Sequence, residues 1–345
     1  MNDISAIEHG QTEAIPYMAR SCDWYLALGY DNPYVWAHHD ETPFAPLLKP
    51  LTQSRIALVT TAAPWQPDKG EQGPGAPYNA AAKFYRVYSG DSSENHDVRI
   101  SHVAIDRKHT SMEDSGTWFP LPILRELSAT GKFILAPRFH GVPTNRSQQH
   151  TRETDAPELL ARCRADGVDA ALLVANCPVC HQSLALAARH LEANGISTVL
   201  MGCARDVVEH CGVPRFLFSD FPLGNAAGRP HDPESQKQTL KLALHLLWDA
   251  NGPNTTRQSP LVWPGPPDWK QDYANPERLR PDELLRLREE AESARLTARA
   301  LRAQHLNVGE ANAQCALLHC SYVGATPSVV AQPTSGQARG PAHPQ

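Results

Sequence analysis

The middle of the chain alternates between short apolar runs and longer stretches in which apolar residues recur every three or four positions. The first pattern is typical of strands buried on both faces of a parallel sheet, and the second is typical of amphipathic helices. Apolar runs that predict strands lie at 55–60, 99–105, 132–136, 170–176, 196–201 and 215–218. Helical patterns lie at 118–127, 154–165, 204–210 and 233–249, and another follows the 170–176 run and closes at 194–195. This alternation predicts an α/β fold with a doubly wound, mostly parallel sheet.

The segments that flank this block differ from it in composition. We expect an N-terminal arm over residues 1–50, rich in aromatic residues and packed on the core or forming part of a substrate lid. An α/β catalytic domain is expected over residues 51–252, with a long loop at 66–96 of the kind that is often functional. Residues 253–312 are expected to form a linker and an amphipathic helix. Residues 313–345, rich in Pro, Ser, Gly and Gln, are expected to be a mostly disordered tail.

The expected helix at 282–304 carries a narrow apolar seam. Its members recur at spacings of three and four, as in a short coiled coil, and they are Leu284, Leu287, Ala291, Ala294, Ala298 and Leu301. Such a seam either pairs with a partner subunit or lies on the helix's own domain. We expect a homo-oligomer that forms through this helix.

Composition narrows the class of protein. The chain has 345 residues, a formal net charge of −5 and no basic block, which argues against nucleic acid as a partner. The N-terminus does not start with basic residues followed by an apolar run, and no apolar stretch approaches the roughly 20 residues that span a bilayer. We therefore expect no membrane association, a cytoplasmic location and a small-molecule substrate. The eight cysteines are expected to be reduced there.

The turn after the central apolar run carries the candidate chemistry. It reads Cys177-Pro178-Val179-Cys180-His181, so both cysteines are expected where a buried strand turns into the first turn of a helix. Backbone N–H groups and the positive end of the helix dipole favour a thiolate at such a position. Cys177 precedes the proline, as the attacking cysteine does in redox turns of this type, and we favour it over Cys180 as the nucleophile.

Other polar residues follow the neighbouring strands. Because parallel strands end at one edge of a sheet, residues from separate strands are expected to converge there. The expected catalytic residues are Cys177, Cys180, His181, Cys203 and His140, with either histidine acting as general acid or base. The expected substrate-binding residues are Thr60, Thr61, His109, Asp114, Arg138, Asp220 and Asn225. His109 and Asp114 could instead cap a helix, Asp220 and Asn225 could structure a loop, and Cys163 and Cys211 are expected to be packing residues.

At Cys177–Gln182 the sequence resembles the B-type catalytic subunits of glycine, sarcosine, betaine and D-proline reductases. The likeness extends over roughly residues 30–250. It also includes Thr42-Pro43-Phe44-Ala45-Pro46, Asp106 with His109 and Asp114, Gly167-Val168-Asp169, and Phe221-Pro222-Leu223-Gly224-Asn225. The resemblance implies a thiolate or selenolate that attacks a small, amino-acid-derived substrate and breaks a carbon–heteroatom bond. Members of the family often carry selenocysteine in this region, whereas this chain has cysteine at both positions.

The resemblance also implies a substrate that is already electrophilic. The proline and glycine systems take a pyruvoyl group from a partner subunit, and nothing in this sequence supplies one. A thiocarbonyl carbon suits a thiol better, as in the thiohydantoin desulfhydrases of ergothioneine breakdown, which this chain resembles. The first hypothesis is therefore hydrolytic desulfuration: Cys177 adds to C=S, sulfide leaves, and water releases the oxo product. Cys180 or Cys203 could hold the departing sulfur or a metal.

Two further hypotheses use the same residues. In dithiol-coupled reduction of a carbon–nitrogen bond, one cysteine attacks and the other resolves the intermediate as a disulfide, so an external reductant is required. In the other, Cys177, Cys180 and Cys203 with a histidine hold a structural zinc ion. No cofactor is expected otherwise. Cys-Pro-Val-Cys-His also matches the c-type haem attachment pattern, which the lack of an export signal argues against.

Overall fold

The computed structural model describes residues 13–30, 34–73, 79, 85–100, 104–144 and 147–307. Its core is a mixed, mostly parallel sheet with helices on both faces, which confirms the predicted α/β fold. Among the described strands of this sheet, only β3 runs antiparallel to its neighbour, which is β6, and the short β5 also pairs with β1. In sheet order the described strands are β10 (Thr255–Gln258), β9 (Arg215–Phe218), β8 (Ser197–Gly202), β7 (Ala170–Val174), β1 (Arg55–Thr60), β6 (Arg138–Gly141) and β3 (Tyr88–Asp91), with β5 at Ile134–Leu135.

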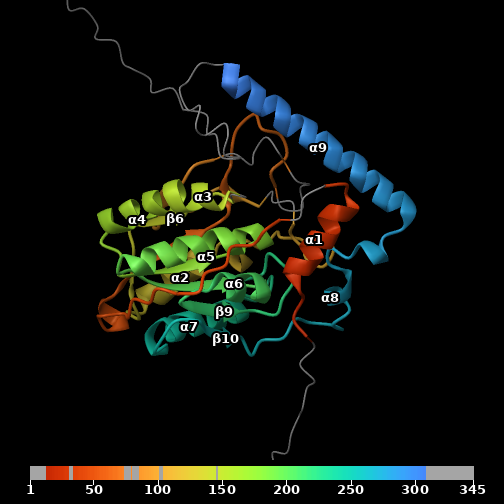
Figure 1. Ribbon diagram of the computed structural model, residues 1–345. Coiled ribbons are helices and arrows are strands. Elements are labelled where there is room, and N and C mark those ends of the chain that lie inside the picture. Colours follow the sequence, from red (N-terminus) through yellow and green to blue (C-terminus); the bar gives the residue numbers. More distant parts are fainter. Residues whose placement is uncertain are drawn as a thin grey trace, which may run out of the picture.

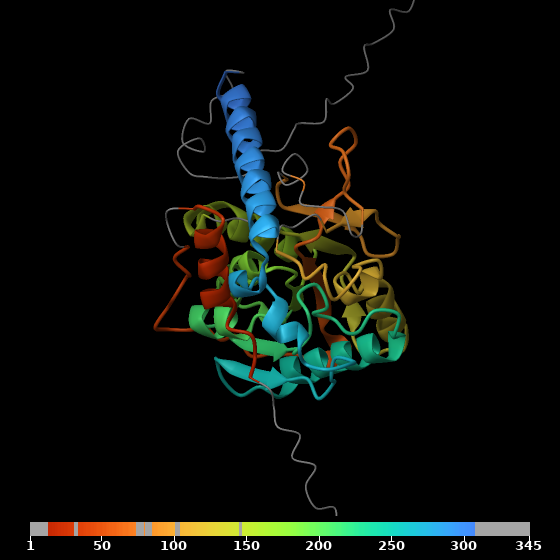
Figure 2. The ribbon, with the colours of Figure 1, turned by 90° about the vertical axis from the view of Figure 1, so that its right-hand side faces the viewer.

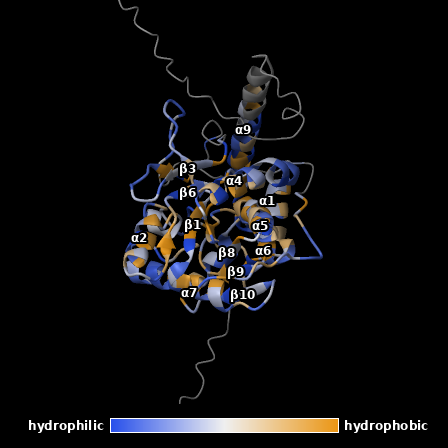
Figure 3. Cartoon of the chain, turned by 90° about the vertical axis from the view of Figure 1, so that its left-hand side faces the viewer, coloured by the Kyte–Doolittle hydropathy of each residue, from blue (hydrophilic) through white to orange (hydrophobic). Residues whose placement is uncertain are grey.

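Two layers of helices enclose the sheet. One face carries α4 (Ala156–Ala165), α5 (Pro178–Ala193) and α6 (Arg205–Cys211), and the other carries α2 (Leu121–Ala129) and α7 (Pro233–Asp249) (Figure 1). Figure 3 shows the apolar strands between these layers. All five residues of β7 are buried, as the uninterrupted apolar run predicts for a strand covered on both faces.

Two predicted strands differ from the structure because of local chemistry. Of the expected strand at 132–136 only Ile134 and Leu135 form a strand, β5. A second strand, β6, begins after Pro137, which has no N–H for the ladder. The prediction of a strand at 99–105 is wrong over its described residues, where only Arg99 is in a strand. That strand, β4 (Val98–Arg99), pairs with β2 (Ala63–Pro64) in a separate two-stranded sheet.

The sheet and its covering continue beyond the expected domain borders. β10 pairs in parallel with β9, so the sheet extends past residue 252. The N-terminal arm contains α1 (Tyr17–Ala27), a helix for which the sequence shows no clean period. Short elements complete the described chain: η1 (Leu51–Gln53), η2 (Ser115–Thr117), α3 (Gln148–His150), the π-type turn η3 (Thr151–Asp155), α8 (Trp269–Asp272) and η4 (Pro276–Arg278).

A buried ion pair holds the end of the arm on the sheet. Arg215 and Glu192 are both fully buried, with Arg215 Nη1 2.8 Å from Glu192 Oε1. The backbone N–H of Ala45 donates to Glu192, and its carbonyl oxygen accepts from Arg215 at 2.9 Å. The guanidinium group also lies 4.1 Å from the centre of the Phe44 ring. The Thr-Pro-Phe-Ala-Pro segment noted in the sequence therefore has a structural role here.

The long helix α9 (Pro281–Asn307) confirms the helix expected at 282–304 and projects from the body (Figure 2). It is attached to the end of α1 by polar contacts. Arg288 Nε donates to the carbonyl oxygen of Ala27 at 2.7 Å, and Arg295 Nη1 donates to that of Gly29 at 3.1 Å. The side chains of seam positions 294, 298 and 301, and the tail at 313–345, lie outside the described residues. None of the described helices is long and apolar enough to cross a membrane.

Candidate active site

The N-terminus of α5 brings two thiols together. Cys177 is the N-cap residue, in extended conformation, and its Sγ accepts a hydrogen bond from the backbone N–H of Cys180 at 3.3 Å. Pro178 occupies the first turn, where its missing N–H costs nothing. The Cys180 thiol lies 3.0 Å from Thr144 Oγ1 and also hydrogen-bonds to Cys177. The strand-to-helix turn thus places both sulfur atoms side by side, as the sequence predicts.

Burial outweighs the helix dipole at this pair. Cys177 is 3% exposed and Cys180 is 0% exposed. Burial, together with the neighbouring Cys180, raises the pKa of Cys177 well above its ordinary value. This closed arrangement therefore favours the protonated Cys177 thiol, whereas the helix N-terminus alone would favour the thiolate.

His181, predicted as a general acid or base, has protein partners at both ring nitrogens, and this geometry does not support that role. Its Nδ1–H donates to the carbonyl oxygen of Cys177 at 2.7 Å. Its Nε2 accepts from the backbone N–H groups of Cys203 at 2.9 Å and Ala204 at 3.1 Å. Burial lowers its pKa to about 4. Because both ring nitrogens are engaged, neither can exchange a proton with substrate.

His140 is also placed differently from the prediction. It lies within β6, and its Nδ1 is 2.9 Å from Ser89 Oγ while its Nε2 is 3.5 Å from Asp166 Oδ2. Burial lowers its pKa to about 4. Arg138, expected to bind substrate, forms an ion pair with the same Asp166 at 2.8 Å. His140 and Arg138 thus interact with the β3–β6 edge and with the end of α4. This geometry does not support the roles at the thiols that the sequence predicted for them.

Thr60 and Thr61 lie at the carboxyl end of β1, as the sequence predicts. Thr61 there contacts two residues that the sequence did not single out, Asn176 and Tyr85. Thr60 Oγ1 accepts from the N–H of Ala62 at 3.0 Å. Thr61 Oγ1 accepts from Asn176 Nδ2 at 3.1 Å, and the Thr61 carbonyl oxygen accepts from the Tyr85 hydroxyl at 3.0 Å. Asn176 was not predicted from the sequence, although its position directly before Cys177 could have indicated it.

Cys203 and Asn225 form a neighbouring buried group. The backbone N–H groups of Asn225 and Phe221 point at the Cys203 thiol, whose pKa is nevertheless raised by burial. Asn225 Nδ2 donates to the carbonyl oxygen of Pro222 at 2.9 Å, which stabilises the loop after β9. Among the described residues no group of three or more His, Cys, Asp or Glu side chains could hold a metal ion. Cys203 therefore does not join Cys177 and Cys180 in the arrangement that a zinc ion needs.

The acidic residues expected to bind substrate have protein partners. Asp220 forms an ion pair with Lys270. Asp114 caps η2 through the N–H of Gly116 at 2.9 Å, and it accepts from Gln236 Nε2 at 2.7 Å. This is the capping alternative that the sequence left open for Asp114.

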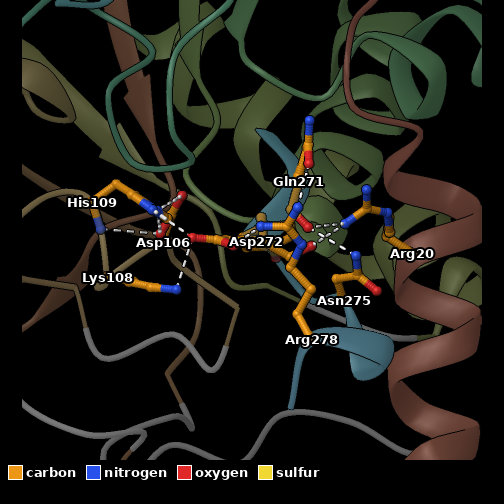
Figure 4. Close-up of polar contacts among 9 residues, drawn as sticks. Arg20, Asp106, Lys108, His109, Gln271, Asp272, Asn275 and Arg278 are labelled. Carbon is orange, nitrogen blue, oxygen red and sulfur yellow. Dashed lines mark hydrogen bonds and ion pairs between the residues drawn. The ribbon is translucent and has the colours of Figure 1, made fainter. Parts of the chain in front are cut away.

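His109 belongs to a polar cluster around Asp272 (Figure 4). Its Nδ1 lies 2.8 Å from Asp106 Oδ1, which is the base–orienter arrangement, and its Nε2 lies 3.5 Å from Asp272. Asp272 also pairs with Lys108 at 2.7 Å and with Arg278 at 3.0 Å. The contacts with Lys108 and His109 fasten the segment 269–278, which we call the cover, to the loop after β4, whereas the pair with Arg278 lies within the cover.

The cover reaches the neighbourhood of the thiols through Tyr273. Tyr273 is buried, and burial raises its pKa well above the ordinary value, with smaller contributions from several groups that include Cys177 and Cys180. Its hydroxyl donates to the carbonyl oxygen of Ala104 at 3.2 Å. Tyr17 of α1 meets the Tyr273 ring edge-on, with ring centroids 5.2 Å apart. Segments from both ends of the described chain thus close the site.

This fold and site define a doubly wound α/β protein with a buried pair of thiols at the carboxyl edge of its sheet. The chain is 34% identical to D-proline reductase subunit gamma of Acetoanaerobium sticklandii over 209 residues, 59% of this chain and 82% of that one. It therefore belongs to the family of the D-proline and glycine reductase B-type subunits.

Two more distant relatives are glycine reductase complex component B subunits gamma. The one from Symbiobacterium thermophilum is 24% identical over 254 residues, 70% of this chain and 56% of that one. The one from Peptoclostridium acidaminophilum is 23% identical over 227 residues, 63% of this chain and 50% of that one. The chain thus spans about half the length of these two relatives. No family model and no solved structure matches the chain.

Proposed function

We propose that this chain is the dithiol component of a reductase that cleaves a carbon–nitrogen bond in a small amino-acid-derived molecule. The observation that carries the proposal is the adjacency of the Cys177 and Cys180 thiols, in a chain that is 34% identical to a D-proline reductase subunit. Two neighbouring thiols supply the two electrons that a reductive cleavage consumes. The sequence itself favoured desulfuration, and the relatives favour this reductive alternative.

The proposed reaction balances with these two residues. Cys177 attacks the carbon that carries nitrogen, and the carbon–nitrogen bond breaks with its electron pair and a proton going to nitrogen. Cys180 then attacks the sulfur of Cys177, a disulfide forms, and the carbon leaves with the second electron pair and takes up a proton. The two protons come from the two thiols, and an external dithiol afterwards reduces the disulfide.

Hydrolytic desulfuration of a thiohydantoin remains the alternative to be tested. It requires a group that activates water beside the thiols, and the two histidines considered for that step have other partners, because His181 is held by backbone groups and His140 lies at the β3–β6 edge. The names of the relatives refer to amino acid reductases. Both observations weigh against C–S hydrolysis as the main activity.

Partner subunits are part of the proposal. The relatives are named as subunits of reductases or of a reductase complex. In this chain α9 projects from the body, which makes it our candidate for contact with a second subunit, including the second copy predicted from its apolar seam. We propose no cofactor for this chain itself.

The test is turnover of D-proline, glycine and a thiohydantoin by the wild type, with and without dithiothreitol. We expect D-proline to be opened to a linear primary amine, or glycine to release ammonia, only with the dithiol, and this activity to be lost in Cys177→Ser and Cys180→Ser but not in Cys163→Ser, whose thiol is buried on α4. Treatment with oxidised dithiothreitol should also form the Cys177–Cys180 disulfide, seen as a mass loss of about 2 Da in that peptide. Multiple-turnover sulfide release without a dithiol would instead establish desulfuration.

A further inference from the structure

Asn176, the residue directly before Cys177, carries an unusual buried oxygen. The residue is fully buried, and its Nδ2 donates to Thr61 Oγ1 at 3.1 Å. Its Oδ1, in contrast, has no hydrogen-bond partner among the described residues. A buried polar atom left unpaired costs about 1–3 kcal/mol, so proteins retain such atoms where something else pairs with them.

The topology of the sheet places this oxygen where a ligand is expected. From β1 the chain moves to β6 on one side, whereas from β7 it moves outward through β8 and β9 on the other side. The direction of winding thus reverses between β1 and β7. Ligands of doubly wound sheets bind at this point, in the crevice outside the carboxyl ends of the two strands. Thr61 follows β1 there, and Asn176 follows β7.

The contacts of the amide group decide what chemistry the oxygen suits. The amide nitrogen is held by Thr61, whose carbonyl oxygen is in turn occupied by the Tyr85 hydroxyl. The side chain is therefore fixed from the β1 side, and its acceptor end is left for a donor at the carboxyl edge of the sheet. A neutral amide oxygen accepts from an N–H or an O–H group, and both substrate classes considered above, amines and thiohydantoins, carry an N–H beside the reacting carbon.

We propose that Asn176 is a specificity-determining residue whose Oδ1 accepts a hydrogen bond from an N–H of the substrate, at the nitrogen bonded to the carbon that Cys177 attacks. The inference rests on the proposed function only in taking Cys177 as the attacking group. It assigns the substrate to small molecules with a primary or secondary nitrogen at the reacting carbon. Analogues without the N–H leave the oxygen unpaired, so the site rejects them.

The test measures how well paired ligands protect Cys177 and Cys180 from iodoacetamide, by peptide mass spectrometry on the full chain. D-proline is compared with cyclopentanecarboxylate, which lacks the nitrogen, and 2-thiohydantoin is compared with its N,N′-dimethyl form. We expect wild type to be protected at least tenfold better by the N–H member of a pair, since about 1.4 kcal/mol corresponds to tenfold. Asn176→Leu, similar in size, should abolish the difference, and Asn176→Asp, which keeps an acceptor, should retain it.

The outcomes separate this inference from the proposed function. A tenfold preference that persists in Asn176→Leu, or no preference for the N–H member of either pair in wild type, overturns the inference. Preference within the thiohydantoin pair alone supports the inference while removing support for an amine substrate. Asn194→Leu, a change at the C-terminal end of α5, serves as the control and should behave as wild type.

Discussion

His181 Nε2 lies 2.9 Å from the backbone nitrogen of Cys203, and this contact ties the helix that carries the thiols to the turn after β8. The approach is close because residue 202 is glycine. A β-carbon built at Gly202 would lie 2.3 Å from His181 Nε2, a distance that no real contact allows. The His181 ring therefore packs directly against the turn after β8. Its other nitrogen donates to the carbonyl oxygen of Cys177, so the ring also holds the start of α5 in place.

Gly202→Ala should destabilise the protein. The added methyl group displaces the His181 ring, and overpacking of this kind costs about 1–3 kcal/mol. The measurement is the free energy of unfolding in urea. Gly252→Ala is the control, since a β-carbon there meets nothing within 4 Å. Equal stabilities of the two variants would show that the ring moves aside without cost.

Glu192→Gln should destabilise the protein more strongly. It removes the carboxylate that pairs with the fully buried Arg215, and an uncompensated buried charge costs about 3–5 kcal/mol. Burial raises the pKa of Glu192 to about 7, so the unfolding experiment is done at pH 8, where the group is ionised. Asp249→Asn breaks the half-exposed pair with Arg257 and should cost at most about 1 kcal/mol. Similar losses in both variants would contradict this account of the arm's attachment.

The pKa of His181, lowered to about 4 by burial, predicts a pH-dependent contribution to stability. In the unfolded chain the residue takes up a proton near pH 6.5, whereas in the folded chain it stays neutral down to about pH 4. Its contribution is therefore complete above pH 6.5 and is lost as the pH falls towards 4. The gap in unfolding free energy between wild type and His181→Asn should shrink by about 2.4 kcal/mol from pH 7 to 4.5. A gap that stays constant would show that the histidine is protonated in the folded state.

Asp272→Asn should loosen the cover and expose the thiols. The carboxylate pairs with Lys108 and lies 3.5 Å from His109, both in the loop after β4, and loss of about 1 kcal/mol from these contacts should speed iodoacetamide labelling of Cys177 and Cys180 about fivefold. High salt should speed the labelling of wild type in the same direction, because it screens the pairs. The control is Glu209→Gln, which breaks the exposed pair with Arg205 on α6. Labelling as slow as in wild type would mean that apolar packing, and not these ion pairs, keeps the cover in place.

Features that depend on neighbours along the chain could be predicted from the sequence. The residues of β9 and α7 agree with the expected bounds, because an apolar run and a proline after a capping aspartate mark them locally. The position of Cys177 at the start of α5 followed from the strand-to-helix turn for the same reason.

Features that depend on distant partners could not be predicted. The sequence shows that His181 adjoins Cys180, but not that the backbone at Cys203 occupies its second nitrogen. His140 follows an apolar run, yet the break at Pro137 places it inside a strand. The pairing of Tyr17 with Tyr273 joins residues from opposite ends of the described chain, and no periodic pattern reports such a contact.

The cover has a consequence for synthesis of the protein. Cys177 and Cys180 stand near the middle of the chain, whereas Tyr273 follows much later. A ribosome therefore releases both thiols well before the cover. During that interval the pair is without Tyr273, and the protection that Asp272→Asn tests begins only once the chain extends past Arg278.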